Sequence, residues 1–270
     1  MLLLLGAGQS NIAAQNKPVT SLALSWVTSS TVFHSKGLNH SFPVSVSYPR
    51  LPVGSNHRLN LLLFLDGQHV FSGWNLENIK QQMEAGKIRP AFILGLHSTD
   101  LRNYFYTPTQ VQGVGGSALA FLRFLGDEFI PHFELNYPIA RGKMNRTLIG
   151  ASHGALLALY QGILQSEQNG FANIIAFSPT IWWDNRHLFQ LSLIRKEFHA
   201  NVFLHSGGKE LNVSPHQLVD EYNQILKGFK ARSFHHHLPE GEHKASTWAI
   251  VLPQALQWIE KARQPDYSSR

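Results

Sequence analysis

The chain has 270 residues, of which 43% are hydrophobic and 15% charged, with a net charge of +6 and no cysteine. This length suits one α/β domain with a large hydrophobic core. The lack of cysteine excludes disulfides, thiolate catalysis and cysteine-ligated zinc, and the scattered Lys and Arg residues do not predict a nucleic-acid surface.

The N-terminal segment, residues 1–30, leaves two interpretations open. Residues 1–8 are apolar, and Ala13-Ala14-Gln15 resembles a cleavage site. A secretory signal also needs a basic start and a longer apolar core. The segment is therefore either an irregular start or a partial signal peptide, and the compartment stays open between cytoplasmic and periplasmic or secreted. No later stretch approaches the roughly 18 apolar residues of a membrane span.

Short apolar runs then alternate with helical patterns, which predicts a mostly parallel sheet covered by helices. Residues 44–48 alternate apolar and polar, which is typical of an antiparallel edge strand. Residues 61–65 are continuously apolar, as in a strand buried on both faces. Further strands are expected at 91–96, 147–150, 173–177, 202–205 and 231–237. Helices are expected at 116–135, 153–166, 215–228 and 245–262.

The helical pattern at 116–135 places Leu119, Leu122 and Phe129 on one predicted buried face. No internal repeat or linker divides the chain. We therefore expect one domain over residues 31–264, followed by a short tail at 265–270.

The segment Gly150-Ala151-Ser152-His153-Gly154 carries the strongest chemical signal. It follows an apolar strand pattern and precedes a helical one, which is the context of a G-x-S-x-G nucleophile elbow in an α/β-hydrolase. The glycines let strand and helix approach closely, and the helix N-terminus directs N–H groups at a developing oxyanion. Ser152 is the predicted nucleophile; the alternative is a glycine-rich turn with a capping serine.

In this fold the acid and then the histidine follow the serine in the chain. His243 lies after the last predicted strand and before the terminal helix, so it is the expected general base. The competing residues His235, His236 and His237 lie within a predicted strand, where alternate rings face opposite sides. We predict no metal site, because a metal there would need further ligands.

The expected acid is Glu210, which lies in a turn after the strand at 202–205 and could hold the imidazole tautomer. The alternatives are Asp184, Asp220, Glu221 and Glu242. Asp220 and Glu221 fall inside a predicted amphipathic helix, and Glu242 adjoins the histidine it would have to orient.

Two backbone N–H groups are candidates for the oxyanion hole. The first is that of His153, directly after the nucleophile. The second comes from the loop after the strand at 61–65, where Gly67 leaves room and the N–H of Gln68 is the candidate donor. An ordinary Asp-Gly turn is the alternative for this loop.

Together these motifs resemble the putative esterase family of α/β-hydrolases, which includes siderophore trilactone esterases, S-formylglutathione hydrolase and the antigen 85 mycolyltransferases. The resemblance runs from Val32 to Ile259. The segments that carry it are Leu65-Asp66-Gly67-Gln68, Thr107-Pro108, Phe121-Leu122-Arg123-Phe124 followed by Pro131, Gly150-Ala151-Ser152-His153-Gly154, Ser178-Pro179-Thr180-Ile181-Trp182-Trp183 and Gly241-Glu242-His243.

The resemblance implies a cofactor-free serine esterase without a large lid, acting on a small-molecule ester, with Glu210 as the acid. It also places Trp182 and Trp183 at the substrate site, although a core or rim aromatic pair is an equal alternative. The chain departs from the family in having His153 where Leu or Met is common, His69 where Asn is frequent, and one glycine after position 153 where two are common.

Three functions remain open at the level of sequence. The first is an esterase for small or siderophore-like esters, working through an acyl-serine. The second is an acyltransferase that uses the same three residues with an acceptor alcohol in place of water. The third is a non-catalytic binding module. Neither the natural ester nor the oligomeric state follows from the sequence.

Overall fold

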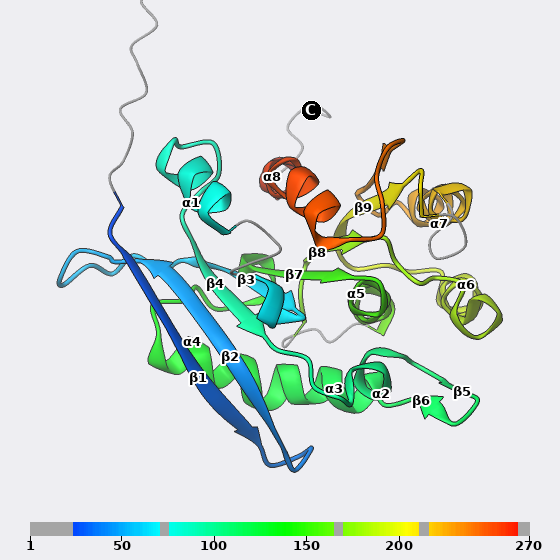
Figure 1. The fold of residues 1–270 in the computed structure, drawn as a ribbon, viewed down its shortest axis with the longest axis horizontal. Coiled ribbons are helices and arrows are strands. Elements are labelled where there is room, and N and C mark those ends of the chain that lie inside the picture. Colours follow the sequence, from blue (N-terminus) through cyan, green and yellow to red (C-terminus); the bar gives the residue numbers. More distant parts are fainter. Residues whose placement is uncertain (1–23, 71–75, 165–169, 211–215, 264–270) are drawn as a thin grey trace, which may run out of the picture.

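A computed structural model describes residues 24–70, 76–164, 170–210 and 216–263 (Figure 1). Within them, one sheet has the strand order β1-β2-β4-β3-β7-β8-β9-β10, and β5 and β6 pair as a small separate hairpin. The strands are β1 (Trp26–Ser35), β2 (His40–Pro49), β3 (Asn60–Leu65), β4 (Ala91–Leu96), β5 (Gln110–Val111), β6 (Val114–Gly115), β7 (Arg146–Ala151), β8 (Asn173–Phe177), β9 (Asn201–Gly207) and β10 (Ser233–Leu238).

The large sheet is mostly parallel. β1 pairs antiparallel with β2, and β2 antiparallel with β4, whereas every pairing from β4 to β10 is parallel. The parallel strands β3, β4, β7 and β8 are almost wholly buried, because helices cover both of their faces. The expected α/β fold with a mostly parallel central sheet is confirmed.

Helices cover the two faces unequally. α1 and α8 pack on one face, and α3 to α7 contribute to the core on the other. None of the described helices is long and apolar enough to span a membrane. The helical elements are η1 (Gly67–His69), α1 (Leu76–Glu84), α2 (Arg102–Tyr106), α3 (Ala118–Phe124), the π-helical η2 (Leu125–Phe129), α4 (Ile130–Asn136), η3 (Lys143–Asn145), α5 (His153–Leu164), α6 (Trp183–Arg195), α7 (His216–Gly228) and α8 (Ala245–Ala262).

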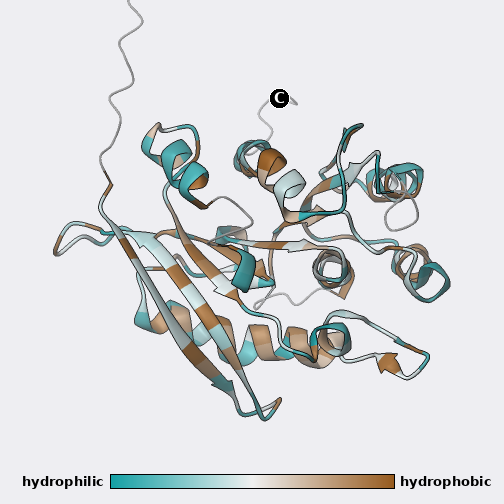
Figure 2. Ribbon diagram, viewed as in Figure 1, coloured by the Kyte–Doolittle hydropathy of each residue, from teal (hydrophilic) through white to brown (hydrophobic). Residues whose placement is uncertain are grey.

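Two sequence expectations were wrong in detail. β2 shows the alternation expected for residues 44–48 (Figure 2), but it is not the edge strand, because β1 pairs along its whole length. Leu119 is 43% exposed. The buried stripe of its helix runs instead through Phe121, Phe124, Phe129 and Phe133, and the π-helical turn at η2 shifts this stripe by one residue.

β1 and α6 are among the elements that the sequence did not predict. The sequence did not predict β1, which starts at Trp26 and so extends across the expected boundary at residue 30. Nor did it predict α6, whose first turn contains the positive-φ residues Asp184, Asn185 and Arg186. Of the expected helix ends, residues 165, 166 and 215 lie outside the described residues.

The carboxyl ends of the parallel strands meet at one edge of the sheet, the place where ligands bind in open α/β folds. β3 leads there into Asp66, β7 into Ser152, and β9 into the turn with Glu210. β10 leads into the loop that carries His243. The candidate residues, which lie between Gln68 and His243 in the sequence, therefore belong to one edge of one sheet.

Candidate active site

Ser152 occupies a sharp turn between β7 and α5. Its φ is +56°, a value that L-residues with side chains rarely adopt. A Cβ on Gly150 would lie 2.4 Å from the carbonyl carbon of Gly154, so only glycine lets the strand and helix pass this closely. The Ser152 N–H donates to the carbonyl oxygen of Phe177 at 3.0 Å, which ties the turn to β8. The strand, turn and helix expected around Ser152 are all present.

Two loops bring His243 and Glu210 together. The N–H of Lys209 donates to the carbonyl oxygen of Gly241 at 2.9 Å, joining the turn after β9 to the loop after β10. His243 Nδ1 lies 3.3 Å from Glu210 Oε2. The Glu210 side chain is fully buried, whereas the His243 ring keeps 24% of its surface exposed. A buried carboxylate thus faces an imidazole whose other edge reaches solvent.

The rival carboxylates have other partners or none near His243. Asp220 lies 3.4 Å from His235, and Glu221 pairs with Arg186. Glu242 pairs with Lys244 at the surface. Asp184 makes no hydrogen bond with His243. Among the described carboxylates, Glu210 is the one in contact with this imidazole.

The loop after β3 is more constrained than an ordinary Asp-Gly turn. Asp66 has a left-handed backbone with φ +57°, and a Cβ on Gly67 would lie 2.2 Å from the carbonyl carbon of Gly95 in β4. The Gln68 side chain bonds Ser98 twice, at 2.6 Å and 3.0 Å. The backbone N–H groups of Gln68 and His153 have no acceptor among the described residues. Both therefore remain available to a ligand oxygen.

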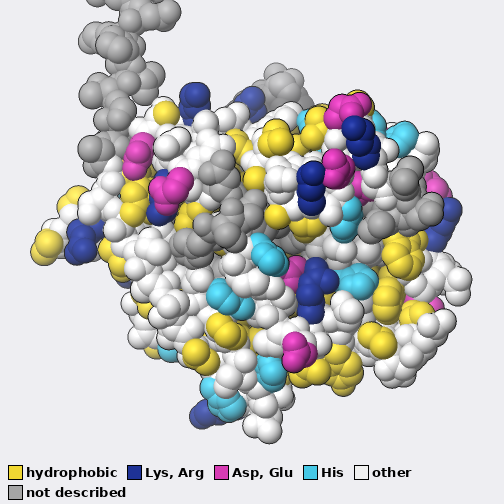
Figure 3. Space-filling view, in the orientation of Figure 1, with side chains coloured by type: hydrophobic (Ala, Val, Ile, Leu, Met, Phe, Trp, Pro, Cys, Tyr) yellow, Lys and Arg dark blue, Asp and Glu magenta, His cyan; other side chains and the backbone are white. Residues whose placement is uncertain are grey.

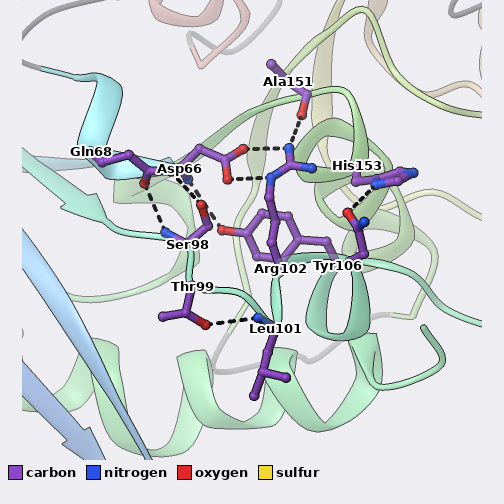
Figure 4. A network of polar contacts seen from close by, with 10 residues as sticks. Asp66, Gln68, Ser98, Thr99, Leu101, Arg102, Tyr106, Ala151 and His153 are labelled. Atoms are coloured by element: carbon purple, nitrogen blue, oxygen red, sulfur yellow. Dashed lines mark hydrogen bonds and ion pairs between the residues drawn. The ribbon is translucent and has the colours of Figure 1, made fainter. Parts of the chain in front are cut away.

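An ion pair that the sequence did not predict connects this loop to the nucleophile turn (Figure 4). Arg102 Nε and Nη2 each lie 2.7 Å from an oxygen of Asp66, and Nη2 also donates to the carbonyl oxygen of Ala151 at 3.3 Å. Burial alone would lower the pKa of Arg102, but hydrogen bonding and charge from Asp66 raise it. The only hint in the sequence is that Arg102 follows the end of β4 closely.

His153 joins the site through its side chain as well as its backbone. Its Nδ1 lies 2.9 Å from Asn103 Oδ1, and its ring meets that of Trp183 edge-on at 5.1 Å. Burial, followed by the charge of Arg102, lowers the pKa of His153 to about 4. His153 is therefore neutral at physiological pH.

The two tryptophans expected at the substrate site differ in environment. Trp183 is partly buried, and its indole N–H donates to Thr109 at 3.1 Å and 3.2 Å. Trp182 is 41% exposed. Trp183 is in ring contact with His153 and so borders the candidate site.

The histidines of β10 face both sides of the strand, as predicted. His235 and His237 lie at 2.8 Å and 3.4 Å from Ser206 Oγ, whereas His236 contacts His205 on the other face. No group of three or more His, Cys, Asp or Glu residues in the described part of the chain is arranged to hold a metal ion.

A pocket of about 220 Å³ is lined in part by Ala151, the residue before Ser152. Its lining consists of Asp66, Gln68, His69, Arg102, Ala151 and Trp248. Figure 3 shows histidine, basic and acidic side chains together near the centre of the face seen in that view. The pocket thus combines a guanidinium, an aromatic ring and the candidate oxyanion loop.

Comparison with known proteins identifies the family of this chain. The family model for "Putative esterase" matches residues 35–259. The chain belongs to the putative esterase family. It is 25% identical to the uncharacterized protein YjcH of Bacillus subtilis over 236 residues, which cover 83% of this chain and 94% of YjcH.

Two solved structures show the same fold. An IroE-like serine hydrolase from Shewanella oneidensis has a TM-score of 0.76 at 21% identity, covering 87% of this chain and 80% of that one. The enterobactin esterase FES from Shigella flexneri has a TM-score of 0.74 at 19% identity, covering 91% of this chain and 62% of that one. Family membership makes this protein a hydrolase of ester substrates.

Proposed function

We propose that this esterase uses Ser152 as nucleophile, His243 as general base and Glu210 as the acid that orients the base. One observation carries the proposal: the buried Glu210 carboxylate lies 3.3 Å from His243 Nδ1, at the sheet edge where the strained Ser152 turn ends β7. A neutral imidazole held through Nδ1 presents Nε2 as the proton acceptor.

In the first half-reaction, Ser152 Oγ attacks the ester carbonyl carbon and its proton passes to His243. The carbonyl oxygen becomes an oxyanion, which accepts hydrogen bonds from the N–H groups of Gln68 and His153. The intermediate then collapses, the carbon–oxygen bond to the alcohol breaks, and the alcohol leaves with the proton from His243. The acyl group remains on Ser152.

In the second half-reaction, water attacks the acyl carbon and gives a proton to His243. The second intermediate uses the same two N–H donors. It collapses by breaking the bond to Ser152 Oγ, which takes the proton back, and the carboxylic acid is released. Glu210 keeps its charge throughout and stabilises the imidazolium in both halves.

Two observations support a small or siderophore-like ester as the substrate. A pocket of about 220 Å³ that is lined by Ala151, the residue before Ser152, has room for one arm of such an ester. The fold is also similar to that of an enzyme named for enterobactin hydrolysis.

The test is a panel of esters from short-acyl p-nitrophenyl esters to catecholate trilactones, with products identified by mass. Ser152→Ala should reduce kcat on the order of 10⁴-fold, because the three residues act as a unit. A fluorophosphonate should label Ser152. A label on another residue, or an active Ser152→Ala variant, would refute the assignment.

A further inference from the structure

Behind the proposed acid lies a hydrogen-bond chain that starts on α8. Trp248 Nε1 donates to Ser178 Oγ at 2.8 Å, and Ser178 Oγ lies 2.5 Å from Glu210 Oε1. An indole N–H can only donate, and an ionised carboxylate can only accept. Ser178 must therefore accept from Trp248 and donate to Glu210, so the direction of the whole chain is determined by chemistry.

This chain decides which oxygen of Glu210 faces the base. Oε1 receives both the Ser178 hydroxyl and the Gly207 N–H, the latter at 2.8 Å. Oε2 is left for His243 Nδ1. Because Glu210 is fully buried, each donor has a strong effect on where the carboxylate sits.

Ser178 is itself held in a conformation that needs support. It follows β8 with φ +48°, is fully buried, and donates its own N–H to the carbonyl oxygen of His205 at 2.8 Å. A positive φ at a serine persists only where the surroundings impose it. The hydroxyl is thus aimed at Glu210 by backbone constraints on both sides.

Trp248 contributes more than an N–H. Its ring meets the His243 ring edge-on at 5.3 Å, with an interplanar angle of 86°. Trp248 also lines the pocket that includes Ala151 and the candidate oxyanion loop. A substrate group in this pocket therefore contacts the side chain that both packs against the base and begins the chain to the acid.

We propose that Ser178 and Trp248 are positioning residues for the His243–Glu210 pair, and that Trp248 also contacts the substrate group that binds in the pocket. The inference rests on the proposed serine mechanism. Two expectations follow from the proposal. Ser178 should affect only the alignment of His243, whereas Trp248 should affect both this alignment and substrate binding.

The test compares Ser178→Ala and Trp248→Phe with matched controls in full-length protein. Ser192→Ala removes another fully buried, hydrogen-bonded hydroxyl, far from the site in α6. Trp258→Phe changes another tryptophan of α8, which packs against Phe203 and Phe234. Thermal unfolding of all four variants identifies any effect that comes from lost stability.

Ser178→Ala should lower kcat about 10- to 100-fold with little change in KM, as expected for a hydrogen bond to a charged group. Trp248→Phe should lower kcat and also change KM. The double variant should have a kcat within about twofold of Ser178→Ala alone, because the indole N–H acts through the hydroxyl. The acidic limb of the kcat/KM profile should move to higher pH in Ser178→Ala, since Glu210 loses a donor and holds an imidazolium more tightly.

A kcat of Ser178→Ala equal to that of Ser192→Ala would overturn the inference, as would fully additive losses in the double variant. An unmoved acidic limb would reduce Ser178 to a structural role and would also overturn it. An active Ser152→Ala variant would instead refute the proposed function, so the two failures are distinguishable.

Discussion

Arg102 binds Asp66 through two parallel hydrogen bonds, from Nε to Oδ1 and from Nη2 to Oδ2, each 2.7 Å long. The contact of Nη2 with the Ala151 carbonyl adds a third tie. Asp66 directly precedes the loop that holds the Gln68 N–H, and Ala151 directly precedes Ser152. One side chain thus sets the spacing between the candidate oxyanion loop and the nucleophile.

Arg102→Lys tests this spacing. Lysine keeps the charge but cannot form the two-bond fork, so we expect kcat to fall about 10-fold or more while KM changes less, as for a displaced oxyanion donor. Steady-state kinetics on a p-nitrophenyl ester measures this. Arg186→Lys, in a half-exposed pair with Glu221, is the control and should be silent. Equal rates for both variants would contradict the spacing role.

Glu210→Gln tests the acid. The Ser178 hydroxyl, the Gly207 N–H and the imidazole all converge on this carboxylate. An amide has one NH₂ group, which must face at least one of these donors, so the imidazole loses its tautomer or its position. We expect kcat to fall roughly 10²- to 10⁴-fold.

The controls for this variant are Asp184→Asn and Glu242→Gln. Both should retain full activity, since neither carboxylate contacts His243. A damaging Asp184→Asn together with a silent Glu210→Gln would assign the acid to α6 and leave Ser152 and His243 in place.

Gly207→Ala tests how closely the two loops must approach. Its Cβ would lie 2.4 Å from the Gly241 carbonyl oxygen and 2.8 Å from Glu210 Oε1. The loops must separate, so activity should fall more than 10-fold, by the sensitivity of catalysis to displacements of about 1 Å. Gly228→Ala, which meets nothing within 4 Å, is the matched control. Ester hydrolysis at wild-type rate by Gly207→Ala would show that the pair tolerates this movement.

His153→Leu tests whether His153 contributes to the pH dependence of kcat/KM that we assign to His243. With the pKa of His153 lowered to about 4 by burial and by Arg102, this ring stays neutral between pH 5 and 8. The acidic limb of kcat/KM in that range therefore belongs to another group and should not move in the variant. The variant keeps the backbone N–H of residue 153, so rates on short acyl esters should stay within about 10-fold. A displaced limb would mean that His153 titrates in the working range.

The pH dependence of folding stability follows from His205. Burial, followed by the nearby His236 ring, lowers the pKa of His205 to about 3, and its Nε2 has no hydrogen-bond partner among the described residues. In the unfolded chain a histidine takes up its proton near pH 6.5. The unfolded state therefore binds more protons below that pH, and stability falls as pH drops from 6.5 toward 3. Above pH 6.5 the full stability is present.

Urea unfolding at pH 7.5, 6 and 5 measures this slope. His205 contributes up to about 1.4 kcal/mol per pH unit in this window, and the lowered pKa values of His153, His235 and His236 act in the same direction. His205→Phe should flatten the slope by up to that amount. An unchanged slope would show that His205 is protonated alike in both states.

Local patterns determined much of this protein. The glycines around Ser152, the apolar runs of β3 and β4, and the chain order of Ser152, Glu210 and His243 are all visible in sequence. Each depends on neighbours in the chain: a tight turn needs glycine beside it, and a strand buried on both faces needs an unbroken apolar run. The elements missed were those without such a local signature. β1 is mostly exposed and forms because β2 pairs with it.

Only the tertiary structure decided which side chains support the candidate active site. Arg102 lies 36 residues from Asp66, Ser178 lies 32 from Glu210, and Trp248 lies 70 from Ser178. Nothing in the residue types marks these partners, since an arginine, a serine and a tryptophan have many uses at any position. Their roles arise because the parallel strands end at one edge, where loops distant in sequence share a small buried volume. In that buried volume each hydrogen bond to a charged group is stronger than it would be in water.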